Sequence, residues 1–236
     1  MSVLLKAGKL EAFYGASQVL HGIDLEVKKG EQIALIGRNG MGKTTLLRSL
    51  MGLVSDCRGS IHFAGQEIAR SAPEIIARAG VAFVPEGRGV FGSLSVVENL
   101  VVAARPSIDG RCTWTLDRIF QLFPRLHQRR SNGGHQLSGG EQQMLTIGRA
   151  LMTNPDLILI DEATEGLAPM VAQDIWSTLG VIRGEGVATI VVDKDFRSLS
   201  KIADRVVLLS KGTVVFEGTP ASLSSQPPML ERHLGV

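Results

Sequence analysis

The sequence predicts an α/β fold with a mainly parallel sheet buried on both faces, an N-terminal antiparallel β flap and an inserted helical subdomain. Short apolar runs recur along the chain with helical patterns between them, as is typical of parallel strands covered on both sides. Between about Gly87 and Pro155 these runs disappear and amphipathic helical patterns replace them. A chain of 236 residues is long enough for one large domain or two small ones.

The flap is predicted by two alternating runs, residues 10–14 and 19–27, with a turn at Lys28-Lys29-Gly30. The first buried strand follows at 32–36, and a glycine-rich turn leads from it into a helix from about Lys43 to Met51. The other expected elements are strands at 81–84, 157–160, 187–192, 206–209 and 213–216, and helices at 96–104, 116–123 and 141–152. We therefore expect one domain over 1–236, with its core in 1–86 and 156–236 and the helical subdomain in 87–155.

Composition excludes several classes of protein. Hydrophobic residues make up 44% and charged residues 20%, which excludes a wholly disordered or fibrous chain. A net charge of +2 is too small for a general field toward nucleic acid or anionic lipid, so any anion must be held locally. Two cysteines and no apolar stretch of bilayer length indicate a cytosolic chain with reduced thiols and no membrane span.

The sequence GRNGMGKT at 37–44 fits the pattern G-x-x-x-x-G-K-[ST] between a predicted strand and a predicted helix, the context that this motif requires. Such glycines let successive backbone N–H groups face phosphate oxygens, and the helix start adds its positive end. We expect Lys43 to bind β- and γ-phosphates and Thr44 to bind Mg²⁺. The alternative is an ordinary glycine-rich turn. The expected binding residues are Gly37, Arg38, Asn39, Gly40, Met41, Gly42, Lys43, Thr44 and Thr45.

Two carboxylates follow the apolar run at 157–160, where a phosphate-binding protein of this kind needs a metal-organising aspartate. Asp161 suits the Mg²⁺ shell. Glu162 is then placed to polarise the water that attacks the γ-phosphate. The alternative is a strand that simply ends in solvated acidic residues.

The sequence LSGGEQQ at 137–143, the signature segment, precedes a predicted amphipathic helix. Ser138 and Glu141 are spaced as a capping box, which is the purely structural alternative. A capping box does not require two adjacent glycines, however, and Gly139 and Gly140 leave backbone N–H groups open to an anion.

These three motifs, in this order and spacing, resemble those of the ATP-binding cassette (ABC) ATPases over essentially the whole chain. The resemblance implies a P-loop NTPase fold of the RecA-like type and hydrolysis of ATP with Mg²⁺. It also implies a head-to-tail dimer in which ATP at Lys43 of one copy is capped by Ser138, Gly139, Gly140 and Glu141 of the other. Tyr14 would stack on the adenine ring, the alternative being a tyrosine packed on the sheet edge.

The sequences HGIDLEVKKGE at 21–31 and FVPEGRGVFGSLSVVENL at 83–100 resemble the second ATPase subunit of branched-chain amino-acid importers, with urea and short-chain amide importers as close relatives. This implies a cytoplasmic subunit on the inner face of the cell membrane, working as a homodimer or with a paralogous ATPase. Its partners would be integral membrane permease subunits and, indirectly, an extracytoplasmic solute-binding protein. No nucleic acid partner is expected.

The chain departs from the family pattern at four positions. Glu86 stands where most members place a glutamine that touches Mg²⁺, and Lys194 where most place a histidine that contacts the γ-phosphate. Lys194 could hold that phosphate as a point charge, or be a solvated lysine at a strand end. Ala163 and Ala168 replace a usual proline and aspartate. Two alternatives therefore stay open: a weakly active or non-hydrolysing partner of a paralogous ATPase, and a soluble ABC ATPase outside transport.

Overall fold

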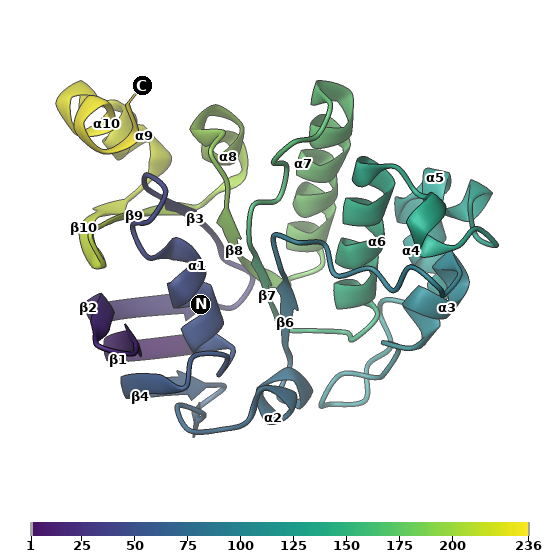
Figure 1. Cartoon of the computed structure of the whole chain (residues 1–236), viewed down its shortest axis with the longest axis horizontal. Coiled ribbons are helices and arrows are strands. Elements are labelled where there is room, and N and C mark those ends of the chain that lie inside the picture. Colours follow the sequence, from purple (N-terminus) through teal and green to yellow (C-terminus); the bar gives the residue numbers. More distant parts are fainter. Residues whose placement is uncertain (1, 236) are drawn as a thin grey trace.

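The computed structural model describes residues 2–235, so the first and last residues of the expected domain, Met1 and Val236, lie outside it. Its larger sheet has six strands in the order β10-β9-β3-β8-β7-β6 (Figure 1). All neighbours in it are parallel except β10 and β9, which confirms the mainly parallel sheet. The strands are β3 (Gln32–Ile36), β6 (Val81–Val84), β7 (Leu157–Ile160), β8 (Ala188–Val192), β9 (Arg205–Ser210) and β10 (Thr213–Gly218).

The flap is a second, antiparallel sheet in the order β2-β1-β4-β5. The two predicted flap strands are confirmed, although both are longer than the sequence pattern indicated. Two strands were not predicted. The longer of them alternates between buried and partly exposed residues only over its last four positions, so its sequence carries little period-two signal. The strands are β1 (Val3–Tyr14), β2 (Ser17–Lys28), β4 (Asp56–Phe63) and β5 (Gln66–Glu67).

Successive residues of the central strands point to opposite faces of the sheet, and each face has its own apolar cluster. Ile33 and Leu35 of β3 pack with α1 (Lys43–Leu50), α2 (Pro73–Arg78) and the flap. Ala34 and Ile36 pack with the helices of the opposite side. Figure 1 shows α1 and the flap on one side, and α6 (Gly139–Leu151) and α7 (Pro169–Gly184) on the other. Burial on both faces explains why these strands are uninterrupted apolar runs.

The segment between β6 and β7 is helical, as predicted, and its helices join the apolar cluster of the second sheet face. The helices predicted at 96–104 and 116–123 end three residues and one residue earlier than expected. The helix predicted at 141–152 begins two residues earlier and ends one residue earlier. The segment contains α3 (Val96–Val101), α4 (Leu116–Leu122), α5 (Pro124–Gln128), the short 3₁₀ turn at Gly134–Gln136 and α6. Along residues 2–235, no helix combines the length and the apolar character that crossing a bilayer requires.

The chain after β8 forms three helices that the sequence patterns did not predict. They are α8 (Phe196–Ile202), between β8 and β9, and α9 (Pro220–Ser224) and α10 (Pro227–Leu234), after β10. Both of the last two begin with proline, whose fixed φ suits the first helical turn. Apolar side chains of α10 pack against the core, so this helix is part of the fold.

Helix α7 begins without a side-chain cap. Its N-cap residue is Ala168, with φ −63° and ψ 144°, the extended conformation that capping residues adopt, and Pro169 is the first helical residue. An aspartate, which the family pattern favours here, would accept a hydrogen bond from the first turn at this position.

We predict that Ala168→Asp raises the free energy of unfolding by about 1 kcal/mol, because the carboxylate satisfies a free backbone N–H group of α7. Urea unfolding followed by tryptophan fluorescence measures the change in the nucleotide-free chain. Ala168→Asn is the matched control: its amide oxygen caps without charge and should give a similar gain. If neither variant is more stable than the parent, the bare N-cap at Ala168 is not a weak point.

Candidate functional site

The phosphate loop, residues 37–42, joins the carboxyl end of β3 to α1, and its shape excludes side chains at two glycines. At Gly37, φ is 144° and a Cβ atom would lie 2.3 Å from the Leu209 carbonyl oxygen. At Gly42, the N-cap of α1, φ is 101° and a Cβ atom would lie 2.9 Å from a methyl carbon of Leu20 in β2. The loop is therefore packed against its own chain, and the first N–H groups of α1 are left to an outside acceptor.

Lys43 is the first residue of α1, and its buried side chain turns back over the phosphate loop. Its Nζ donates hydrogen bonds to the carbonyl oxygens of Gly37 at 2.8 Å and Arg38 at 3.0 Å. Burial lowers the pKa of Lys43; Asp161 and Glu165 oppose this shift, and Lys194 adds to it. These three charged groups therefore act on the ammonium that a phosphate would contact.

Asp161 lies directly after β7, and only 1% of its surface is exposed. The Thr44 hydroxyl donates to its Oδ1 at 3.2 Å, so residues far apart in sequence share one oxygen-rich position. Burial raises the pKa of Asp161 and the charge of Glu86 raises it further, while Thr44 and nearby basic groups oppose the shift. Hydroxyl and carboxylate oxygens are the donors that Mg²⁺ prefers, and a cation here would offset the desolvation of this carboxylate. The residues fit a magnesium site.

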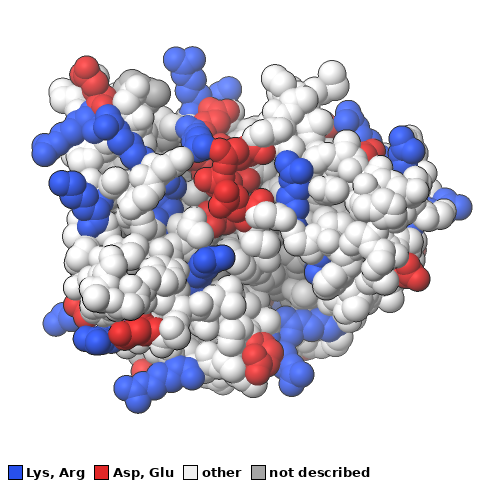
Figure 2. All heavy atoms as spheres, in the orientation of Figure 1, with Lys and Arg blue, Asp and Glu red and all other residues white. Residues whose placement is uncertain are grey.

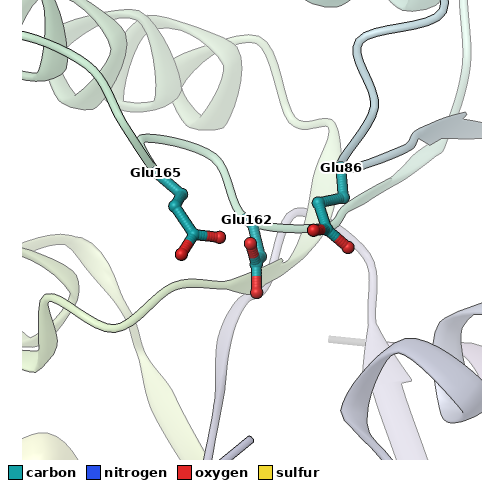
Figure 3. A group of neighbouring side chains, drawn as sticks. All are labelled: Glu86, Glu162 and Glu165. Carbon is teal, nitrogen blue, oxygen red and sulfur yellow. The ribbon is translucent and has the colours of Figure 1, made fainter.

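Glu86, Glu162 and Glu165 form an acidic cluster in which one oxygen of each side chain lies within 4.8 Å of the others. Figure 3 shows their carboxylates turned toward one another from the chain after β6 and the turn after β7. Figure 2 shows acidic side chains gathered in the middle of this face. Glu162 has φ 53°, and its buried Oε2 has no hydrogen-bond partner among the described residues. Glu165 was not predicted; an acidic residue three positions after Glu162 was the only signal.

Lys194 follows β8 and forms an ion pair with Glu165. Its side chain is exposed, as the solvated-lysine alternative expects, but it is not free. One residue earlier, the Oδ2 of buried Asp193 accepts hydrogen bonds from Thr164 N and Thr164 Oγ1, both at 2.8 Å. Asp193, which the sequence did not single out, therefore joins the loops after β7 and β8.

A cleft of about 800 Å³ adjoins these loops. The phosphate loop, the segment after β8 and the apolar face of α10 line it. Arg38 also donates from Nη2 to the Glu231 carbonyl oxygen of α10 at 3.3 Å. Arg38 and Asn39, expected as phosphate-loop residues, thus border a space that the sequence patterns did not indicate.

In the signature segment the capping box is present. Ser138 Oγ accepts from Glu141 N at 3.3 Å, and a Glu141 carboxylate oxygen accepts from Ser138 N at 2.8 Å. Gly140 also has a packing reason within the chain, because a Cβ atom there would lie 2.5 Å from a methyl carbon of Val171. A Cβ atom at Gly139 would lie 2.7 Å from Nη1 of Arg88, the end of a flexible side chain that can move away.

The structure does not bring the signature segment to the phosphate loop. Within residues 2–235 no hydrogen bond or ion pair joins Ser138, Gly139 or Gly140 to that loop or to the acidic cluster. Their helices, α6 and α1, lie on opposite sides of the sheet (Figure 1). Tyr14 lies at the end of β1, opposite Ser17, with 47% of its surface exposed.

We predict that Asp161→Asn stabilises the chain without nucleotide and metal at pH 7. The pKa of Asp161 is raised by folding, so the native state binds its proton more tightly than the unfolded state does. Ionisation above the ordinary aspartate pKa of 3.8 therefore costs stability, and the amide removes that cost. The increase in the free energy of unfolding, measured by urea unfolding, should become smaller as the pH falls toward 4.

Asp109→Asn is the control of opposite sign. Hydrogen bonds from Ser107 and Arg111 lower the pKa of Asp109 to about 2, so its charge stabilises the native state above pH 4. That variant should lose stability at pH 7. An Asp161→Asn variant that is less stable than the parent at pH 7 would contradict our account of the buried carboxylate.

Comparison with known proteins places this geometry in a family. Residues 20–165 match the model of the ABC transporter family. The chain is 41% identical to the high-affinity branched-chain amino acid transport ATP-binding protein BraG of Pseudomonas aeruginosa, over 98% of this chain and all of that protein. It is 33% identical to the probable branched-chain amino acid transport ATP-binding protein LivF of Archaeoglobus fulgidus, over 99% of each. A solved structure of an ATP-binding subunit of an ABC transporter aligns with a TM-score of 0.81 at 29% identity, over 94% of this chain and 92% of that one. The chain belongs to the ABC transporter family, among its ATP-binding proteins.

Proposed function

We propose that this chain is the ATP-hydrolysing subunit of an importer for branched-chain amino acids and drives a separate membrane permease. The observation that carries the enzymatic part is the meeting of Lys43, Thr44, Asp161 and Glu162 at one edge of the parallel sheet. The full-length similarity to a branched-chain amino acid transport protein supports the solute class. The family membership favours transport over a soluble ABC ATPase with another role.

In the proposed mechanism, Lys43 and the free N–H groups of the phosphate loop hold the β- and γ-phosphates of ATP. Tyr14, exposed on the flap, stacks on the adenine ring. Thr44 and Asp161 would hold Mg²⁺, with Glu86 as a further carboxylate, and the bound ion would neutralise charge on the phosphates. Glu162 polarises the attacking water, and its carboxylate accepts the water proton; the buried Oε2 has no hydrogen-bond partner among the described residues that would compete for it.

We infer that two copies of the chain are needed for each complete site. The phosphate loop and the signature segment lie on different sides of the sheet in one chain. A second copy facing head to tail would bring its Ser138, Gly139 and Gly140 to the nucleotide, while Glu141 keeps the capping box intact. A paralogous ATPase could replace the second copy, as the two-ATPase importers suggest.

We further propose that the loop at 85–92 transmits movement from the permease. Phe91 is exposed, and α6 holds its loop: Arg149 stacks 4.3 Å over the Phe91 ring, and Thr146 Oγ1 donates to the Arg88 carbonyl oxygen at 2.5 Å. A permease segment that displaces Phe91 therefore moves α6, the helix that begins in the signature segment. In this proposal the helical subdomain, residues 87–155, transmits this movement to a nucleotide-binding core formed by 1–86 and 156–236. The chain would work on the inner face of the membrane, with an extracytoplasmic solute-binding protein on the other side.

We predict that Glu162→Gln lowers the steady-state ATPase rate by a factor of 100 or more, because general-base assistance contributes about 10² to 10⁴. Glu74→Gln, an exposed glutamate at the start of α2, is the matched control and should leave the rate unchanged. The proposal fails if the wild type, alone and with a paralogous ATPase added, turns over no faster than Glu162→Gln. That result would favour the non-hydrolysing alternative.

The same assay identifies the solute when the chain is reconstituted with its co-purified permease and binding protein. Leucine, isoleucine or valine should stimulate ATP turnover, and urea or short-chain amides should not. Stimulation by urea alone would leave the ATPase proposal intact and overturn the solute class.

We predict that Lys43→Ala and Ser138→Arg, each inactive alone, recover roughly a quarter of the wild-type ATPase rate when mixed, because half of the dimers then contain one intact composite site. Mixing Lys43→Ala with the double variant Lys43→Ala/Ser138→Arg should recover nothing. A mixture of the two single variants that stays at the sum of its components would contradict the head-to-tail arrangement.

A further inference from the structure

Glu165 and Lys194 lie opposite each other where two neighbouring strands end. β7 and β8 are parallel, with Ile160 paired to Val191. Beyond this pair, Ala163 N donates to the Val192 carbonyl oxygen at 3.2 Å. The two loops therefore leave the sheet side by side and bring the ammonium of Lys194 to the carboxylate of Glu165.

The backbones of the two loops are held together independently of that ion pair. The carboxylate of Asp193 accepts two hydrogen bonds from Thr164 at 2.8 Å and one from Asp195 N at 2.9 Å. These bonds involve the residues directly before Glu165 and on either side of Lys194. The ion pair can therefore open by side-chain rotation while both loops keep their positions.

The ion pair is exposed enough for another anion to replace the Glu165 carboxylate at Lys194. The side chains of Lys194 and Glu165 are 55% and 41% exposed, and such pairs contribute at most about 1 kcal/mol. Both groups also act on the ammonium of Lys43. Burial is the main cause of the lowered pKa of Lys43; the charge of Lys194 lowers this pKa further, and the charge of Glu165 opposes the shift. A terminal phosphate held by Lys43 would therefore lie in the electrostatic field of Lys194. This phosphate would compete with the Glu165 carboxylate for the Lys194 ammonium.

We propose that Glu165 is a positioning residue that holds Lys194 in the nucleotide-free chain and yields it to the terminal phosphate of ATP. The proposal rests on the proposed nucleotide site. ADP lacks that phosphate, so the exchange distinguishes ATP from ADP. Once Lys194 has left, the Glu165 carboxylate stands beside those of Glu86 and Glu162, and their mutual repulsion acts on the turn at 162–166 that leads to α7. ATP binding is thereby transmitted to the start of α7.

A double-mutant cycle tests the exchange. The affinities for a non-hydrolysable ATP analogue and for ADP, both with Mg²⁺, are measured by calorimetry on the full chain, with its mass checked by light scattering. Glu165→Gln should raise the ratio of analogue affinity to ADP affinity by about two- to fivefold, because the competing anion is gone. In the Lys194→Gln background the same substitution should leave the ratio unchanged. Glu74→Gln should leave it unchanged in both backgrounds.

An equal rise in both backgrounds would overturn the exchange, because it would reflect the long-range charge of Glu165 alone. A fall in the ratio for Glu165→Gln would also overturn it. If the wild type binds both nucleotides and the cycle shows no coupling, only this inference fails. If the wild type binds neither nucleotide, the proposed function fails and the inference fails with it.

Discussion

The parallel pairing of β3, β8 and β7 is the constraint on which the rest of the site depends. Leu35 is paired with Val192, and Ile160 with Val191, so the three strands end at the same edge of the sheet. The phosphate loop, the acidic turn after β7 and the loop carrying Lys194 begin there. Because both faces of the strands are covered by apolar clusters, a slip in register would expose buried residues on either side. The packing of the sheet therefore fixes the chemistry at its edge.

The site contains buried charged groups whose cost in folding free energy a bound nucleotide and metal would relieve. Burial lowers the pKa of Lys43 and raises that of Asp161, so each group is destabilised in its charged form. Glu162 adopts a positive φ and keeps one buried oxygen without a partner among the described residues. Sites that break local rules in this way are expected where structure serves function. In the proposed function, phosphates and a divalent cation would supply the charges that balance these groups.

The sequence was sufficient for features set by local patterns. The strands at 32–36, 81–84 and 157–160 were predicted to the residue, because two-sided burial makes each an uninterrupted apolar run. Contacts between distant segments left no such pattern. Arg88 against Gly139, Val171 against Gly140 and Lys194 with Glu165 depend on how loops meet in space. β4 was missed because its residues alternate only over its last four positions. α10 is amphipathic, but it has only eight residues and begins with two prolines, and its packing against the core leaves no local signal.

The central claim is that one chain supplies both halves of a nucleotide site but cannot join its own halves. A high-resolution structure of the Glu162→Gln chain with Mg-ATP tests this most directly. The account predicts a dimer in which each ATP contacts Lys43 of one protomer and Ser138 of its partner. An ATP whose phosphates are reached by the phosphate loop and the signature segment of the same protomer would contradict it.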